Sequence, residues 1–257
     1  MSIINRLAVI LCGYEFIPHA VSYDGGGDRF WHAVPVCAYL MDTDEGYIIV
    51  EGGLDERKLR DPALRQRYFP QRAGYPTPLV APQHEIIPQL AAMRVAPTDV
   101  AHIIQTHLHA DHTGHTMSFP NATVYIQRAD YDYARRQSPA NGYIPEEFDV
   151  PADRLRLLDG DTDLFPGLKL VSTPGHSPGH QSPLLTLKDG RRFLLVGDVV
   201  DDRRNMAENI LPGGMTNRAQ ARASMERIRM IMNEGATGIF LHDAAQVREL
   251  PLAPEWV

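Results

Sequence analysis

Residues 102 to 115 read His-Ile-Ile-Gln-Thr-His-Leu-His-Ala-Asp-His-Thr-Gly-His, and the rest of the chain is organised around this stretch. The apolar run from Val100 to Ile104 predicts a buried strand that ends at Gln105 and Thr106. The imidazoles and the carboxylate that follow would therefore lie at the C-terminal edge of that strand. Ligand-binding loops of layered α/β folds collect at this edge, so the stretch predicts a binding site.

The side chains after this strand are those that a divalent cation prefers. His107 and His109 are two positions apart and can point the same way, and Asp111 and His112 follow on a tight turn. Neutral imidazole and carboxylate suit zinc, iron or manganese. The alternative is a solvated polar loop, or histidines satisfied in a core. We disfavour it because three imidazoles and a carboxylate within six positions would repel one another and be costly to desolvate without a cation.

The segment from His107 to His112 resembles the metal-binding signature of the metallo-β-lactamase superfamily. Its flanks, Val-Pro-Val-Cys-Ala-Tyr-Leu at 34–40 and Phe-Pro-Asn-Ala-Thr at 119–123, resemble the branch that includes N-acyl-homoserine lactonases and related small-lactone hydrolases. The resemblance covers nearly the whole chain. It implies an α/β fold of four layers, an αββα sandwich, and we expect residues 1–257 to form a single hydrolase domain.

The same resemblance assigns the other polar residues at strand ends. A predicted strand at 168–172 leads into Thr-Pro-Gly-His-Ser-Pro-Gly-His, the superfamily segment in which His176 would complete the first metal site, with His180 in a supporting role. A strand at 192–196 ends in Gly-Asp, and Asp198 matches the bridging carboxylate. The strand at 238–241 ends at His242, the last ligand. The implied ligand set is therefore His107, His109 and His176 for one metal, and Asp111, His112 and His242 for the other, with Asp198 shared. His115 is not expected to be a ligand.

Composition narrows the classes of partner. The chain has 257 residues, 44% of them hydrophobic, a formal charge of -7 and no block of lysines or arginines, which argues against nucleic acid as the main partner. Only two cysteines occur, so we expect no disulfide framework and a cytoplasmic location. The apolar run at 7–12 is better explained as a first strand than as a leader, and no stretch reaches the roughly 18 to 20 apolar residues of a membrane span.

Several further elements follow from local patterns. Phe30, Trp31 and His32 are expected to cap the core, with the wall of a pocket as the less favoured alternative. Glu51 stands where lactonase-like relatives tend to carry an aspartate that supports the ligands. Residues 55–85 are interrupted by five prolines and predict a surface insertion or lid, or equally a passive connection.

We expect strands at 7–17, 33–40, 47–50, 122–127 and 155–158, a hairpin over 33–50, and helices at 86–93, 129–136 and 217–234, with another beginning at Thr113.

The implied chemistry is hydrolysis. Two cations about 3.5 to 4 Å apart can share a water whose pKa falls to about 7, which gives hydroxide at neutral pH, and they polarise the carbonyl under attack. No serine or cysteine triad is then needed, and Asp111 and Asp198 are the expected catalytic carboxylates. The cofactor would be two divalent metal ions, zinc by preference, with iron, manganese or cobalt as alternatives.

One position departs from the lactonase pattern. Lactonases carry a tyrosine three residues after the bridging aspartate, whereas this chain has Asp201 there, which we interpret as part of a solvated charge run with residues 202–204. Opening of an N-acyl-homoserine lactone or another small lactone is the leading hypothesis. A thioester or ester hydrolase of the glyoxalase II kind, a single-iron sulfur oxygenase and a non-catalytic metal protein are the alternatives. We expect a small-molecule substrate, no nucleic acid, no membrane and, as an open alternative, a homodimer.

Overall fold

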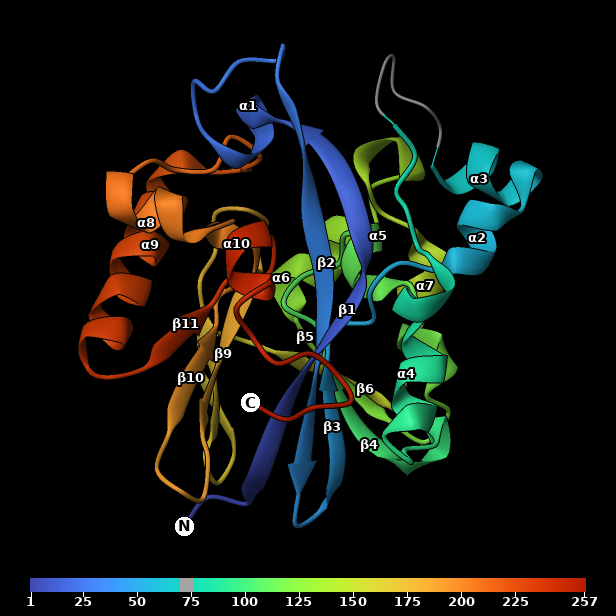
Figure 1. Cartoon of the computed structure of the whole chain (residues 1–257), viewed down its shortest axis with the longest axis vertical. Helices are drawn as coiled ribbons and strands as arrows, with labels where there is room; N and C mark the ends of the chain where they lie inside the picture. The colour runs from blue at the N-terminus through green and yellow to red at the C-terminus, as the bar shows by residue number, and fades with distance from the viewer. Residues whose placement is uncertain (70–75) are drawn as a thin grey trace.

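Two mixed β-sheets pack face to face, and helices cover the outer face of each. The computed structural model describes residues 1–69 and 76–257. In Figure 1 the larger sheet runs through the middle, with α4 to α7 on one side and the second sheet on the other, and α8 and α9 lie outside that second sheet. The expected four-layer αββα sandwich is confirmed.

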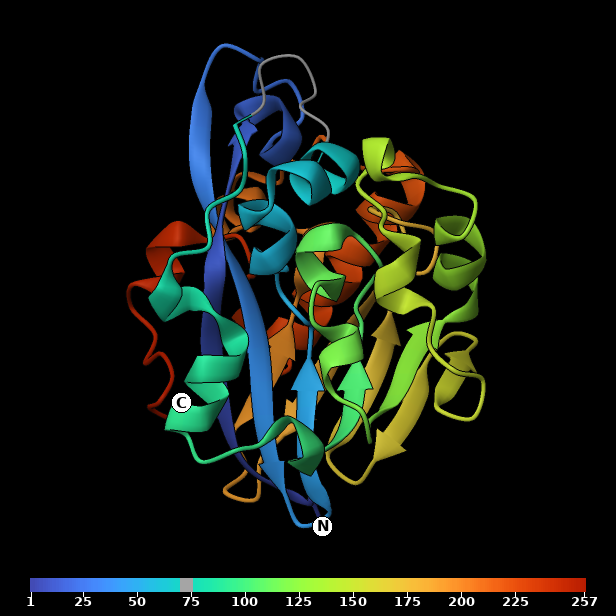
Figure 2. The same cartoon turned by 90° about the vertical axis from the view of Figure 1, so that its right-hand side faces the viewer.

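The larger sheet has six strands in chain order. β1 and β2 pair antiparallel along almost their whole length, β2 and β3 form the predicted hairpin, and β3 to β6 run parallel. The C-terminal ends of these parallel strands point the same way, as Figure 2 shows. The strands are β1 Ile4–Pro18, β2 Trp31–Thr43, β3 Gly46–Val50, β4 Val100–Ile104, β5 Thr123–Gln127 and β6 Leu155–Leu158.

The smaller sheet has five strands in the order β11-β10-β9-β8-β7. Its only parallel pair joins β10 and β11, so these two strands end at the same edge. The strands are β7 Thr162–Phe165, β8 Leu168–Ser172, β9 Gln181–Thr186, β10 Arg192–Leu195 and β11 Thr237–Ile239. The sequence patterns predicted β8, β10 and β11.

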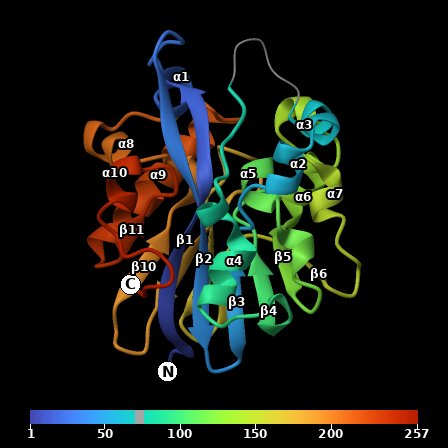
Figure 3. The same ribbon diagram turned by 45° about the vertical axis from the view of Figure 1, so that its right-hand side comes forward.

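The helices are short, apart from α9 on the outer face of the smaller sheet. Figure 3 shows α2 to α7 grouped on the other side of the molecule. The α-helices are α1 His19–Ser22, α2 Glu56–Arg60, α3 Pro62–Tyr68, α4 Ile86–Ala92, α5 Ala110–Thr113, α6 Arg128–Ala134, α7 Pro145–Phe148, α8 Arg203–Glu208, α9 Arg218–Asn233 and α10 Ala244–Val247. The 3-10 helices are η1 Pro82–His84, η2 Pro97–Asp99, η3 Thr116–Ser118, η4 Pro139–Asn141 and η5 Gly197–Val199.

Alternate side chains of each strand face opposite sides of the sheet, and so contribute to different hydrophobic cores. On β1, Ala8 and Ile10 face the core under α4 to α7, whereas Leu7 and Val9 face the core between the two sheets. A third core lies between the smaller sheet and α8 and α9, where Met225 is fully buried. Successive side chains of a strand point to opposite faces, and both faces of the larger sheet are covered, so β1 reads as continuously apolar.

Three expectations need correction or qualification. Phe30 and Trp31 are exposed, at 69% and 38%, so they are not core residues. The short helix α5, Ala110–Thr113, lies within the metal motif and ends at Thr113, and η3 follows at Thr116–Ser118, so no helix begins at Thr113. The proline-rich segment contains α2 and α3, and the expected lid lies partly outside the described residues, at 70–75. Within the described ranges, no helix is long and apolar enough to cross a membrane.

Candidate metal centre

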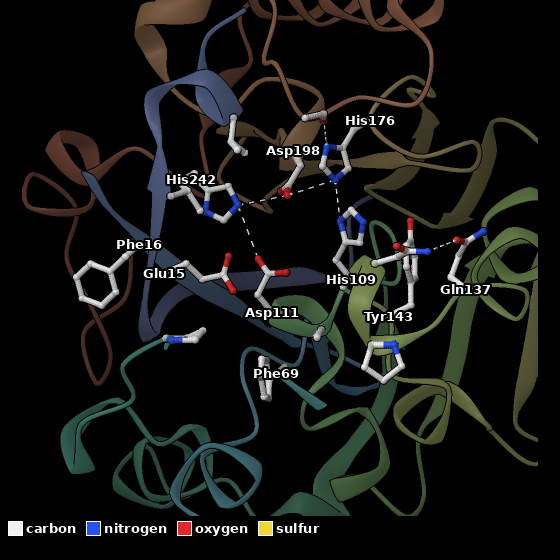
Figure 4. A pocket seen from close by; sticks show the side chains of 18 of the residues that line it. Glu15, Phe16, Phe69, His109, Asp111, Gln137, Tyr143, His176, Asp198 and His242 are labelled. Atoms are coloured by element: carbon white, nitrogen blue, oxygen red, sulfur yellow. Dashed lines mark hydrogen bonds and ion pairs between the residues drawn. The ribbon is translucent and has the colours of Figure 1, made fainter. Parts of the chain in front are cut away.

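Four strand ends meet where the two sheets open at one edge of the sandwich. The loop after β4 carries His107, His109 and the residues of α5, and the loop after β8 carries His176. Asp198 follows β10 in η5, and His242 follows β11. Figure 4 shows side chains from all four loops pointing toward one another. The structure thus brings together every residue that the sequence predicted for the site.

Three imidazoles and one carboxylate form the first cluster: His107, His109, His176 and Asp198. Nδ1 of His109 lies 2.9 Å from Nε2 of His107 and 2.9 Å from Nε2 of His176. The Nε2 atoms of His107 and His176 are 3.2 Å apart, and Oδ2 of Asp198 lies 3.6 to 3.7 Å from both. Four donor atoms from three loops therefore face one small volume.

The second cluster combines Asp111, His112, His242 and Asp198. Nε2 of His112 lies 3.1 Å from Oδ2 of Asp111 and 3.3 Å from Oδ2 of Asp198. Nε2 of His242 lies 3.2 Å from the same Asp198 oxygen and 3.8 Å from Oδ2 of Asp111. One oxygen of Asp198 therefore belongs to both clusters, which is the geometry of a bridging carboxylate.

The donor set fits two divalent cations. Zinc binds imidazole nitrogen at about 2.0 to 2.1 Å, so two nitrogens of a tetrahedral site lie roughly 3.3 Å apart, close to the separations in the first cluster. Among the described residues, Oδ1 of Asp198 is buried without a hydrogen-bond partner. Both ring nitrogens of His112 are also buried, and they face carboxylate oxygens at 3.1 to 3.3 Å without forming a well-oriented hydrogen bond. Buried polar atoms without partners are costly, and a cation would satisfy those that face the clusters.

Outer contacts fix which ring nitrogen faces the clusters. Nδ1 of His176 lies 2.7 Å from the carbonyl oxygen of Gly214, and Nδ1 of His242 lies 2.9 Å from that of Pro35. Each Nδ1–H can donate there, which leaves Nε2 free as a donor to a metal. Nδ1 of His112 faces Oε1 of the fully buried Glu51 at 3.3 Å. Glu51 thus contacts a predicted ligand, as the sequence analysis anticipated for this position.

The two remaining histidines of the motifs lie outside both clusters. His115 is buried, and its ring contacts Glu56 at 2.8 Å and Ser118 at 3.1 Å. His180 is also buried, and its Nε2 accepts a hydrogen bond of 3.1 Å from the backbone N–H of Asp198. His180 therefore holds the loop that carries Asp198, which agrees with a supporting role.

The two clusters differ in charge. Burial, together with His176, lowers the pKa of His109 to about 3, and burial also lowers the pKa of His107 and His176. In the second cluster burial opposes protonation, but Asp198 and other nearby carboxylates raise the pKa of His242 to about 10 and raise that of His112 strongly. Without metal, the three imidazoles of the first cluster are neutral at pH 7, whereas the imidazoles of the second cluster hold protons that a cation must displace.

A cavity of about 630 Å³ opens above the clusters. Asp111, Asp198, His109, His176 and His242 lie at its base. Neutral aromatic and amide side chains also line the cavity, and these are Tyr68, Phe69, Tyr133, Gln137, Asn141 and Tyr143. The cavity has the size of a small-ligand pocket, and the clusters are accessible from it.

Two pocket residues change the sequence-based account. Asp201 lines the cavity and is only 4% exposed, so its assignment to a solvated charge run was wrong. Its side chain lines the cavity, whereas Arg203 and Arg204 contact the carboxylates of Asp243 and Glu208. Glu15 of β1 also lines the cavity, beside Asp111 in Figure 4. Glu15 was not predicted from the sequence, although a lone carboxylate within the apolar strand at 7–17 is a signal of such a site.

Comparison with known proteins places the chain in a family. Residues 33–232 match the model of the metallo-beta-lactamase superfamily. The chain belongs to the metallo-β-lactamase superfamily. Among members of this superfamily, an N-acyl homoserine lactonase from a Bacillus species is 32% identical over 225 residues, with 87% of each chain covered. The N-acyl homoserine lactonase AttM of Rhizobium johnstonii is 31% identical, with 88% of each chain covered.

Solved structures of the superfamily agree with this placement. An N-acyl homoserine lactone hydrolase with the product N-hexanoyl-L-homoserine bound at its catalytic metal center superposes with a TM-score of 0.88 at 27% identity, and each chain is fully covered. A dizinc quorum-quenching lactonase with a TM-score of 0.68 at 17% identity, covering 94% of this chain and 92% of the other, shares the fold. The lactonase-like resemblance of the sequence motifs is thereby confirmed. That the seven gathered residues are metal ligands stays a prediction.

Proposed function

We propose that this chain is a dinuclear metal-dependent hydrolase that opens the ring of a lactone, with N-acyl homoserine lactones as the first candidates. The observation that carries the proposal is the position of Oδ2 of Asp198, within 3.2 to 3.7 Å of imidazole nitrogens from both clusters at the base of the cavity. The lactonases to which the chain is similar support the choice of substrate. Two complete clusters favour a dinuclear over a mononuclear site.

Each residue has a specific task in this proposal. His107, His109 and His176 would hold one cation, Asp111, His112 and His242 the other, and Asp198 would contact both. Two divalent cations supply a Lewis acid for the carbonyl and lower the pKa of water, which removes the need for a nucleophilic side chain. The carbonyl contacts of His176 and His242 keep the ring orientations fixed, so the site needs little reorganisation during reaction.

The cavity walls would orient the substrate. The ring of Tyr143 packs on the ring of His109, with the centroids 4.5 Å apart, and this places an aromatic surface beside the first cluster. An acyl chain can pack on this side of the cavity, where Phe69 and Tyr133 also lie, and the ester carbonyl then faces the clusters. The proposal therefore predicts a substrate with an apolar or neutral portion next to a reactive ester.

Metal content and turnover, measured together, test the proposal. We expect two divalent metal ions per chain and opening of N-acyl homoserine lactones, with weaker turnover of thioesters and phosphoesters. Asp198→Asn should lower kcat/KM at least about 100-fold and reduce metal content, because one substitution removes an oxygen from both clusters. Its far-UV circular dichroism should stay unchanged. Asp163→Asn, at an exposed position on β7, is the matched control.

Three results would contradict the proposal. One iron per chain with oxygen uptake would indicate a different chemistry. Two metals without turnover of any lactone would refute the substrate class. Full activity in the Asp198→Asn variant would show that this carboxylate has no role in catalysis.

A further inference from the structure

The ends of β1 and β2 extend beyond the rest of the larger sheet. β1 and β2 pair as far as Pro18 and Trp31, whereas β3 pairs only with residues 39–43 of β2. The helix α1 and a loop join the two strand ends, and Figure 1 and Figure 3 show this unit projecting above the sandwich. We call residues 14–35 the arm. The arm forms part of the pocket, because the cavity is lined by its residues Glu15, Phe16, Ile17 and Val21.

A path of hydrogen bonds leads from the arm to a predicted metal ligand. The carbonyl oxygen of Val21 accepts hydrogen bonds from the N–H groups of Gly213, at 2.7 Å, and Gly214, at 3.0 Å. The carbonyl oxygen of Gly214 in turn lies 2.7 Å from Nδ1 of His176. A carbonyl oxygen can only accept, so Nδ1 donates and Nε2 is left to face the first cluster. The orientation of the His176 ring therefore depends on where Val21 holds the Gly213–Gly214 segment.

The arm also contacts the second cluster, through a different carbonyl group. Nδ1 of His242 lies 2.9 Å from the carbonyl oxygen of Pro35, at the base of the arm. Pro35 is the partner of Tyr14 in the pairing of β1 with β2. One continuous part of the chain thus holds one predicted ligand of each cluster. A change confined to the contacts of Val21 should disturb His176 and leave His242 in place.

Gly213 permits the close approach between the arm and the loop after α8. A Cβ atom at position 213 would lie 1.7 Å from the carbonyl oxygen of Ala20. This contact is far too short for two atoms that are not bonded, so any side chain would push the loop away from α1. The φ of Gly213 lies outside the left-handed region. Glycine is therefore needed here because of the contact with the arm and not because of backbone strain.

A buried amide holds the arm against the same loop. Asn205 of α8 is fully buried, and its side-chain N–H groups donate to the carbonyl oxygens of Ser22, at 2.9 Å, and Ile210, at 3.1 Å. The backbone N–H of Asp24 donates to the carbonyl oxygen of Leu211 at 2.8 Å. Loss of these bonds would leave buried carbonyl groups unpaired, which is costly. The position of the arm relative to the loop is thus fixed from both sides of Val21.

We propose that the arm positions the first metal cluster, with Val21 orienting His176 through Gly213 and Gly214, and with Gly213 and Asn205 as positioning residues. This inference rests on the proposed metal centre and concerns how that centre is held. The side chains of Val21 and Met215 line the cavity, so the contacts that orient the ligand also set the position of a pocket wall. The arm thereby keeps the first cluster and the bound substrate in a fixed relation.

The tautomer of His176 gives a readout that needs neither metal nor turnover. At pH 8 a neutral imidazole carries its proton on one of its two nitrogens, and two-bond 15N–1H correlation spectra show which one. In the metal-free parent protein we expect the Nδ1–H tautomer of His176. Gly213→Ala should displace the Gly214 carbonyl, and His176 should then show the Nε2–H tautomer or a mixture of the two. The signals of His242, which Pro35 holds, should stay unchanged.

Metal affinity, measured by chelator competition, gives a second readout. Gly213→Ala should lower the affinity of the first cluster for its cation about 10- to 100-fold, which is the usual cost of losing a partner that orients a ligand. The affinity of the second cluster should change less than about threefold. Excess metal should restore most of the lactone turnover, because all seven predicted ligands remain. Asn205→Leu removes both side-chain donors at similar volume and should give the same pattern, so it provides the test if Gly213→Ala does not fold.

Gly235→Ala is the matched control. Gly235 has φ of +95°, and an added Cβ would meet no atom within 4 Å, so this substitution lowers stability through backbone strain alone. We expect the parent tautomer of His176 and both parent metal affinities in this variant.

Several results would overturn the inference. One is an Nε2–H tautomer of His176 in the parent, and another is a parent-like tautomer and first-cluster affinity in both Gly213→Ala and Asn205→Leu. Equal losses at the two clusters, or the same losses in Gly235→Ala, would show a general effect on the fold and would also overturn it. Absence of lactone opening by the parent, with the tautomer and affinity pattern retained, would refute the proposed reaction and leave the role of the arm standing.

Discussion

Nε2 of His242 lies 3.2 Å from Oδ2 of Asp198, and the same oxygen lies 3.6 Å from Nε2 of His176 in the other cluster. The loops after β8, β10 and β11 thus meet at a single atom. A change in the protonation of one cluster therefore reaches the other through Asp198.

Loading of the second cation should depend steeply on pH. The pKa of His242 is raised to about 10 and that of His112 is also raised, so both hold protons at pH 7 that a cation must displace. Affinity should rise about tenfold per pH unit for each displaced proton. The first cation should bind with a weaker dependence, because His107, His109 and His176 are already neutral. Chelator competition between pH 6 and pH 8 measures both steps, and equal slopes would contradict this difference.

Glu51→Gln should lower the affinity of the second cluster for its cation and leave the affinity of the first cluster unchanged. Oε1 of Glu51 faces Nδ1 of His112 at 3.3 Å, and removing its charge makes this imidazole a poorer donor. We expect a loss of about 10- to 100-fold in affinity. Glu56→Gln is the matched control, since Glu56 contacts His115 at 2.8 Å outside both clusters. A comparable loss in both variants would indicate a general effect on the fold.

Asp201→Asn should stabilise the metal-free protein at neutral pH. The pKa of Asp201 is raised from 3.8 to about 8, because burial penalises its ionised form. Above pH 4 the unfolded state gains free energy by ionising while the folded state stays protonated, so the penalty grows up to about pH 8. The Tm difference between variant and parent should therefore increase from pH 4 to pH 8. A constant difference would show that Asp201 ionises normally.

Gly175→Ala should disturb the loop that carries His176. Gly175 has φ of +140°, and an added Cβ would lie 2.3 Å from the backbone nitrogen of Ala221 in α9. We expect a loss of about 2 to 4 kcal/mol in unfolding free energy, measured in urea, and weaker binding of the first cation. Gly190→Ala, with φ of +89° and open space around it, should cost only about 1 to 2 kcal/mol and leave metal binding intact.

The sequence by itself determined the layered fold and predicted which residues the structure gathers into two clusters. Buried strands appear in the amino-acid sequence as continuous apolar runs, and the polar ligands must follow at their ends. Both features can therefore be recognised from the sequence alone. The segment from His107 to His112, the strand before Asp198 and the strand before His242 all followed this rule. The resemblance then assigned each residue to a cluster, and the structure brings all of them together.

Only the tertiary structure decided which polar residues line the cavity. Asp201 stands among charged neighbours and looks solvated in sequence, yet it is buried and lines the cavity. Phe30 and Trp31 look like core residues, yet they are exposed beyond the covered part of the sheet. Glu15 interrupts an apolar strand because β1 extends over the cavity, where its partner across the strand pair is Val34. Local sequence gives the period of a strand, but burial depends on what packs against each face, and that is set by segments distant in the chain.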